Sequence, residues 1–81
     1  MLIGRGMIRI TVKLFATLRE GRFEVLERRF TEGVTIGDVL RELVIPEKQA
    51  TLILVNGRHA ELTTRLAEGD VLAIFPPVGG G

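Results

Sequence analysis

Apolar and polar residues alternate along the first regular segment of the chain, MIRITVKLF (7–15). Four apolar residues share one face of this segment: Ile8, Ile10, Val12 and Leu14. A period of two with β-branched residues predicts a half-buried strand. RFEVLERRF (22–30) predicts a second strand, and Gly21 places a turn between the two, so a hairpin is expected. The second strand carries the charges typical of a sheet edge: Glu24, Glu27, Arg28 and Arg29.

A single helix is predicted after these strands. Its apolar residues recur at helical spacing: Ile36, Val39, Leu40 and Leu43. Thr35 is a candidate N-cap, and Asp38 three residues later resembles the acidic member of a capping box. Pro46 should end the helix by residue 45.

The second half of the chain predicts three more strands. TLILV (51–55) is followed by Asn56-Gly57, the strongest two-residue hairpin signal, and then by RHAEL (58–62). VLAIF (71–75) is the last strand, because Pro76 and Pro77 cannot donate to a ladder.

The order of strands and helix predicts an α+β protein with a β-grasp (ubiquitin-like) roll. One helix has to cover one face of a mixed five-stranded sheet, with the first and last strands as parallel central neighbours. The expected organisation is a flexible leader (1–6), the β-grasp domain (7–78) and a flexible glycine tail (79–81).

Charge and composition narrow the possible functions. Eleven basic and ten acidic residues give a net charge of +1, which provides no electrostatic case for nucleic acid or an anionic membrane. No apolar run approaches the roughly 18 residues of a bilayer span. The start of the chain also lacks the features of a signal peptide, so a cytoplasmic protein is expected.

The side chains usual in catalysis are nearly absent. The sequence has no cysteine, serine, tyrosine or tryptophan, and His59 is its one histidine. Cysteine ligands, thiolate nucleophiles and histidine clusters are therefore excluded within this chain, and no metal site is expected. His59 is expected to be a solvated strand residue. These absences argue against a self-contained enzyme.

The tail provides a different kind of chemistry. Two prolines stiffen the exit from the last strand and project the glycines 79–81 away from the domain. From Pro76 to Gly81 the reach is on the order of 20 Å at about 3.3 Å per residue, enough to enter another protein's active site. Residues without a Cβ let the backbone pass through a narrow channel. The reactive group at this end is the α-carboxylate of Gly81, which becomes electrophilic once activated, for instance as a mixed anhydride with AMP.

Several motifs resemble the small subunit of molybdopterin synthase, within the ubiquitin-like sulfur carrier family. The resemblance runs from Met7 to Gly81 and is carried by VKLFATLRE (12–20), EGVTIGDVL (32–40), VNG (55–57), LAEGDVLAIFPPV (66–78) and the final Gly-Gly.

That resemblance implies a sulfur carrier without a bound cofactor. An E1-like adenylyltransferase would use ATP to adenylate Gly81, which is then converted to a thiocarboxylate. Gly80 would line the channel of the activating partner. The large synthase subunit would be the catalytic partner, and this chain its non-catalytic small subunit.

Three alternatives stay open at this point. The segment between the helix and the third strand (44–51) is shorter than in many molybdopterin synthase subunits, which brings the chain near the thiamine-pathway sulfur carrier. The same activated glycine could form an isopeptide bond with a target lysine, as in a ubiquitin-like modifier. A plain β-grasp binding module with an inert tail is the third. The sequence does not choose between molybdenum and tungsten.

Strand alternation predicts a docking surface beside the tail. Leu72 and Ile74 should point inward with Ile53 and Val55, which leaves Leu52 and Val71 outward. The residues expected to contact a partner are four outward apolar ones and the exit segment: Phe15, Leu54, Ala73, Phe75, Pro76, Pro77, Val78 and Gly79. Apolar patches of this kind on small domains usually mark an interface.

Overall fold

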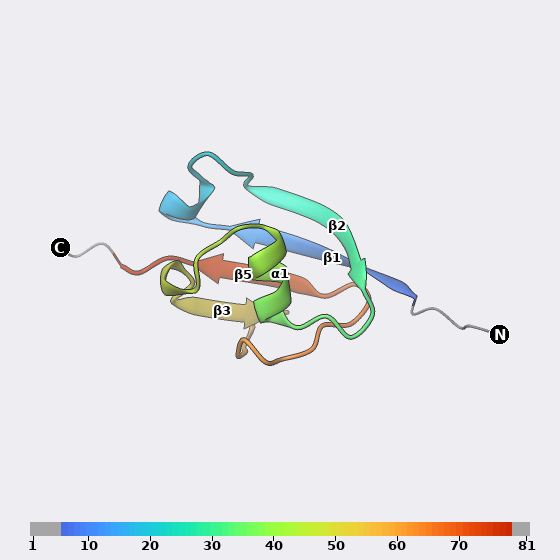
Figure 1. Cartoon of the computed structure of the whole chain (residues 1–81). Helices are drawn as coiled ribbons and strands as arrows, with labels where there is room; N and C mark the ends of the chain where they lie inside the picture. The colour runs from blue at the N-terminus through green and yellow to red at the C-terminus, as the bar shows by residue number, and fades with distance from the viewer. Residues whose placement is uncertain (1–5, 79–81) are drawn as a thin grey trace.

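The computed structural model describes residues 6–78, which form one mixed sheet with an α-helix across one of its faces (Figure 1). In chain order the elements are β1 (Met7–Leu14), the 3-10 helix η1 (Ala16–Arg19), β2 (Val25–Thr31), α1 (Ile36–Glu42), the 3-10 helix η2 (Glu47–Gln49), β3 (Leu52–Val55), β4 (Arg58–His59) and β5 (Val71–Phe75). The expected leader and tail fall mostly outside this range, at residues 1–5 and 79–81.

The strand order is β2-β1-β5-β3-β4, so β1 and β5 lie side by side in the middle of the sheet. They run parallel, with Val12 opposite Leu72, whereas β1–β2, β3–β5 and β3–β4 are antiparallel. The predicted β-grasp fold is confirmed, including its central parallel pair. The charged strand β2 lies at one edge of the sheet, as expected.

The core lies between the inner face of the sheet and α1. The four alternating residues of β1 are at most 8% exposed, and Leu72 and Ile74 of β5 are fully buried. The same core takes apolar residues from the helix and the loops: Leu18, Phe30, Val34, Ile36, Val39, Leu40, Ile45, Ile53 and Leu66. Val55 packs partly buried against this cluster. The predicted inward faces of β1, β3 and β5 are therefore confirmed.

The start of α1 has the predicted capping box. The hydroxyl of Thr35 accepts a hydrogen bond from the Asp38 backbone N–H at 3.2 Å, and the Asp38 carboxylate accepts one from the Thr35 N–H at 3.0 Å. The hydrogen bond that the Thr35 backbone N–H donates to the Asp38 carboxylate is the largest cause that lowers the pKa of Asp38, and the Thr35 side chain and the charge of Arg41 lower it further.

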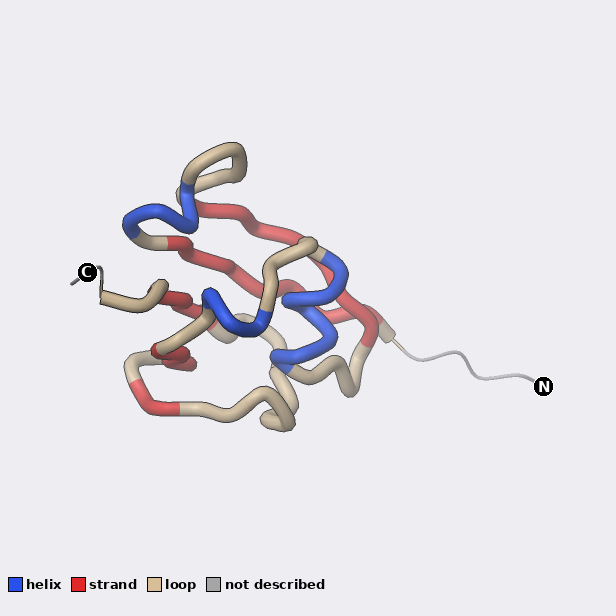
Figure 2. Tube along the Cα trace, turned by 60° about the vertical axis from the view of Figure 1, so that its left-hand side comes forward, coloured by secondary structure: helices blue, strands red, loops and turns tan. Residues whose placement is uncertain are grey.

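The loop between β4 and β5 satisfies the next two N–H groups of the helix. Ile36 donates to the Thr64 carbonyl at 3.0 Å, and Gly37 donates to the Leu62 carbonyl at 2.9 Å. A Cβ on residue 37 would lie 3.3 Å from that Leu62 oxygen, so glycine permits the close approach. In Figure 2 this loop runs alongside the beginning of the helix.

The helix ends at Glu42, before the proline that was expected to stop it. The Ile45 N–H bonds to the Leu40 carbonyl at 2.9 Å and the Val44 N–H to the Arg41 carbonyl at 3.1 Å, which is the bond pattern of a Schellman motif. Val44 occupies the position that glycine usually takes and has a φ of 57°. A β-branched residue in this left-handed region is strained.

Several predicted boundaries were wrong, and the two largest differences have a tertiary cause. The link between β1 and β2 is no simple turn, because η1 folds back and places Leu18 in the core at 1% exposure. As a result β2 begins at Val25 instead of residue 22. Strand β4 ends at His59 instead of residue 62, since the chain after Ala60 turns towards α1. Strands β1 and β3 are each one residue shorter than predicted.

The predicted Asn56-Gly57 turn joins β3 and β4 and also holds the start of β5. Both residues have positive φ, 52° and 83°, as a two-residue hairpin requires. The Asn56 side chain donates to the Asp70 carboxylate at 2.8 Å and accepts from the Val71 N–H at 2.9 Å. The turn therefore fixes where the last strand begins.

Within residues 6–78, no helix has both the length and the apolar character needed to cross a membrane.

We expect Val44→Gly to stabilise the domain. Glycine relieves the strain of the positive φ, and the lost side chain is 77% exposed, so the free energy of unfolding should rise by about 1 kcal/mol. Val44→Ala keeps the Cβ and should gain less. Urea unfolding of the three proteins measures the difference, and a loss of stability in Val44→Gly would contradict the strained geometry.

The capping box should make stability depend on acid pH. Because the pKa of Asp38 is lowered in the folded state, its contribution is complete above the unfolded pKa of about 4 and is lost as pH falls through the folded pKa. Asp38→Asn keeps an acceptor for Thr35 but does not ionise, so its melting temperature should fall less on acidification. Thermal melts between about pH 7 and pH 2 test this. Parallel losses in the two proteins would refute it.

Candidate functional site

The chain leaves the sheet at Phe75, the last residue of the central strand β5. The backbone is held on both sides there, since Phe15 donates to the Ile74 carbonyl at 3.2 Å and Thr51 to the Phe75 carbonyl at 2.9 Å. Pro76 and Pro77 have no N–H with which to continue the ladder. Exposure rises along this exit, from a half-buried Pro76 to Val78 at 94%. The predicted site residues Gly79, Gly80 and Gly81 lie outside the described residues.

Two phenylalanines stack beside the exit. The rings of Phe15 and Phe75 have centroids 4.2 Å apart and are inclined by 9°. Phe15 follows β1 and Phe75 ends β5, so the parallel pairing of these strands brings the rings together. A contact of this kind contributes about 0.5–1.5 kcal/mol beyond the area it buries. It therefore helps to fix Phe75 at the point where the chain departs.

Sequence reasoning missed Arg19, which holds Phe15 from the η1 side. Its guanidinium carbon lies 5.6 Å from the Phe15 ring centroid, and its Nε donates to the Leu14 carbonyl at 3.0 Å. A partly exposed ion pair with Glu24 at 3.7 Å orients it further. An arginine four residues after an aromatic residue would have suggested this contact only if η1 had been foreseen.

The predicted apolar residues lie together on the outer face of the sheet, the face away from α1. Leu54 is directly opposite Ala73, and Leu52 is opposite Phe75. We call the half-buried group formed by Phe15, Leu52, Leu54, Ala73 and Phe75 the outer patch. A shallow hollow of about 210 Å³ adjoins it, lined by Lys13, Leu14, Phe15, Arg19, Glu24 and Val25.

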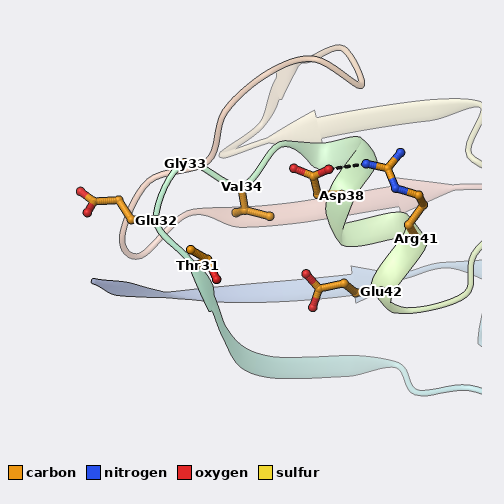
Figure 3. Close-up of a pocket in the computed structure, with 7 residues that line it drawn as sticks. All are labelled: Thr31, Glu32, Gly33, Val34, Asp38, Arg41 and Glu42. Carbon is orange, nitrogen blue, oxygen red and sulfur yellow. Dashed lines mark hydrogen bonds and ion pairs between the residues drawn. The ribbon is translucent and has the colours of Figure 1, made fainter. Parts of the chain in front are cut away.

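A second hollow, of about 300 Å³, lies at the other end of the sheet, where β2 turns into α1 (Figure 3). It is lined by Thr31, Glu32, Gly33, Val34, Asp38, Arg41 and Glu42. The Asp38 carboxylate here is already bonded to Thr35 and paired with Arg41. Its role is to hold the start of the helix, and this hollow is remote from the exit of the chain.

Neither His59 nor the acidic residues belong to a metal-binding cluster in the part of the chain that the structure describes. His59 is exposed on β4, opposite Leu54, as the prediction of a solvated strand residue required. Among residues 6–78, no three histidine, cysteine or acidic side chains are grouped to hold a metal ion.

The sequence profile of one family, described as the ThiS family, matches residues 12–81. This match covers the end of β1, the helix, all of β5 and the exit. The chain belongs to the ThiS family.

Relatives of this ThiS-family chain include a small archaeal modifier protein and subunit 1 of molybdopterin converting factors. Small archaeal modifier protein 3 of Haloferax volcanii is 34% identical, over 89% of this chain and 98% of its own length. A Pyrococcus furiosus protein assigned as subunit 1 of a molybdopterin converting factor has a solved structure that superposes with a TM-score of 0.70 at 30% identity, covering 88% of this chain and 99% of its own. A complex of subunits 1 and 2 of the molybdopterin-converting factor of Helicobacter pylori also matches, with a TM-score of 0.61 at 25% identity, over 91% of this chain and all of the matched one.

In this ThiS-family domain the residues that form the core and the residues that stay accessible lie on opposite faces of the sheet. The inner face of the sheet is used entirely for the core, while the outer patch and the exit leave one end accessible. The domain holds the segment that follows Phe75 and offers a surface beside it.

Proposed function

We propose that this protein carries sulfur as a thiocarboxylate on Gly81 and donates it for the synthesis of molybdopterin. The observation that carries the proposal is the exit itself. A central strand, fixed by neighbours on both sides, ends in Pro76-Pro77 and leads to a Val78 that is 94% exposed. The likeness to the molybdopterin converting factor subunits supports the choice of pathway.

The chemistry takes place on the α-carboxylate. One carboxylate oxygen attacks the α-phosphate of ATP, which gives an acyl-adenylate and releases pyrophosphate. A persulfide on a separate donor then attacks the acyl carbon and displaces AMP, which gives an acyl disulfide. A thiol then cleaves the S–S bond, so the thiocarboxylate is released and the thiol and the donor sulfur end as a disulfide. Glycine suits this end because no Cβ hinders the approach to the acyl carbon.

Two protein partners follow from this scheme. An E1-like adenylyltransferase activates Gly81, and the large subunit of molybdopterin synthase receives the sulfur. The assembly of subunits 1 and 2 named for the Helicobacter pylori proteins supports the second partner. We assign the outer patch, with Pro76, Pro77 and Val78, as the docking surface for both, because it is an accessible apolar surface beside the exit.

Two alternatives use the same activated glycine. In protein modification a lysine amine of the target displaces AMP and forms an isopeptide bond, and the likeness to a small archaeal modifier protein favours this role. In thiazole synthesis the thiocarboxylate is made in the same way and donated to a thiamine precursor. The match to the ThiS family keeps that pathway open.

The mass of the protein isolated from its native host should distinguish these roles. Sulfur carriage predicts a form heavier by the replacement of one oxygen with sulfur, located by fragmentation at Gly81. Deleting Gly80 and Gly81 should abolish this form and leave the melting temperature unchanged. Conjugates to other chains without a thiocarboxylate would favour modification, and full function of the deleted protein would favour an inert tail.

Phe75→Ala should weaken docking while the domain stays folded. Loss of the stacked ring should lower the free energy of unfolding by about 1–2 kcal/mol, whereas Ile74→Ala in the core should cost about 3 kcal/mol. Affinity for the large subunit, measured by calorimetry, should fall at least about tenfold in Phe75→Ala.

Val44→Ala provides the matched control for this experiment. It removes an exposed apolar side chain that lies off the sheet, so affinity for the large subunit should not change. If Phe75→Ala bound the large subunit as tightly as the wild type, the outer patch would not be the docking surface.

A further inference from the structure

Two arginines face each other on the outer face of the sheet, at the end away from the outer patch. Arg9 of β1 is the direct cross-strand partner of Arg29 of β2. Ile8 and Ile10 on either side of Arg9 are buried, so alternation turns Arg9 and its partner outward, and both residues are exposed.

The local hydrogen bonding brings these two side chains close. Arg9 donates its backbone N–H to Glu68 at 2.9 Å and accepts from the Gly69 N–H at 2.8 Å, so its backbone groups point away from β2. Arg9 and Arg29 therefore form a pair without mutual backbone bonds. In antiparallel sheets this class of pair has its side chains closer together.

The pair has no counter-charge bonded to it in residues 6–78. The ion pairs in that range are Arg19–Glu24, Arg28–Glu42 and Arg41–Asp38. Glu68 lines the same open hollow of about 470 Å³ with Met7, Arg9 and Arg29, but its carboxylate binds the Arg9 backbone and not a guanidinium.

Like charges directly opposite in a sheet are destabilising. Lys13 adds a third exposed cation to the same face of β1, while Glu27, opposite Thr11, and Glu68 are anions on or beside this face. The domain as a whole is close to neutral at +1, so this local positive charge does not follow from an excess of basic residues.

The arginine pair is continuous with the outer patch. Arg9 of β1 lies on the same face as Phe15, the residue that follows this strand, six positions and therefore roughly 20 Å away. A standard protein interface covers about 800 Å² on each partner, or about 30 Å across. An interface of this width that contains the outer patch can therefore extend to Arg9 and Arg29 at its rim.

We propose that Arg9 and Arg29 bind carboxylate side chains of the partner that docks on the outer patch, the large subunit of molybdopterin synthase. The inference rests on the proposed function for the identity of the partner. The guanidinium pair steers these carboxylates onto the sheet and sets the orientation of the partner, while the outer patch supplies the apolar contact. A phosphate-bearing small molecule is the competing occupant of the same charge.

The charge reversal Arg29→Glu tests this with two readouts that move in opposite directions. The variant replaces a like-charged pair with an opposite one, so its melting temperature should equal or exceed that of the wild type. Its association rate with the large subunit, by stopped flow, should fall at least about threefold at 0.05 M salt, and the difference should vanish near 1 M salt. A merely structural arginine would lower stability when reversed.

Arg58→Glu is the matched control. It makes the same change in net charge at the exposed edge strand β4, opposite the inward-facing Val55, and should leave the association rate close to that of the wild type. An equal slowing in both variants would show only an effect of net charge and would overturn the proposal.

The remaining outcomes separate the two proposals. If the wild type binds the large subunit and Arg29→Glu binds at the same rate, the arginine pair is not a docking element, although the proposed function stands. Inorganic phosphate that shifts the Arg9 and Arg29 side-chain NMR signals at millimolar concentration, with no change in partner binding, would also overturn the proposal in favour of a small anion. If the wild type carries a thiocarboxylate but does not bind the large subunit, both the molybdopterin assignment and this inference fail.

Discussion

The parallel pairing of β1 with β5 is the constraint on which the rest of the structure depends. It places the last strand, β5, in the middle of the sheet, between β1 on one side and β3 on the other. Ile74 and Phe75 are consequently held by backbone bonds from both neighbours, and Phe15 is carried to the ring of Phe75. A terminal segment attached to an edge strand would leave with one flank unpaired. Here its direction is set by the whole sheet.

Contacts between distant parts of the chain keep this central pair in register. The Asn56 side chain binds Asp70 and Val71 and so fixes the start of β5, while the loop that follows β4 bonds to the first turn of α1. On the other side, Arg28 of β2 lies over the Phe30 ring and pairs with Glu42 at the end of the helix. A chain of 81 residues buries a limited fraction of its surface, and it contains no cysteine for disulfides. The contacts of α1 with the loop after β4 and with Arg28 therefore help to hold the helix on the sheet.

The two faces of the sheet consequently have different roles. The inner face is covered by α1 and contributes the fully buried residues, so changes there act on folding. The outer face has an apolar region near the exit and a cationic region about 20 Å along β1, and neither is needed to complete the core. Because of this separation, the domain can bind a partner through its outer face without disturbing its own packing.

The sequence by itself determined the elements that depend on local periodicity and capping. The alternation in 7–15 and 71–75, the box formed by Thr35 and Asp38, and the Asn56-Gly57 turn each involve neighbours within a few residues. Each lies within one residue of its predicted position. Because strand alternation has a period of two, it also assigned Phe15, Leu54, Ala73 and Phe75 to the face away from the helix.

Only the tertiary structure decided the remainder, because those features depend on contacts between residues far apart in the chain. The fold of η1 around Leu18, the early end of β4 and the placement of Arg19 over Phe15 have no local signal. The juxtaposition of Arg9 and Arg29 needs the register of two strands, which alternation alone does not give, since a shift by two residues preserves every face but changes every partner.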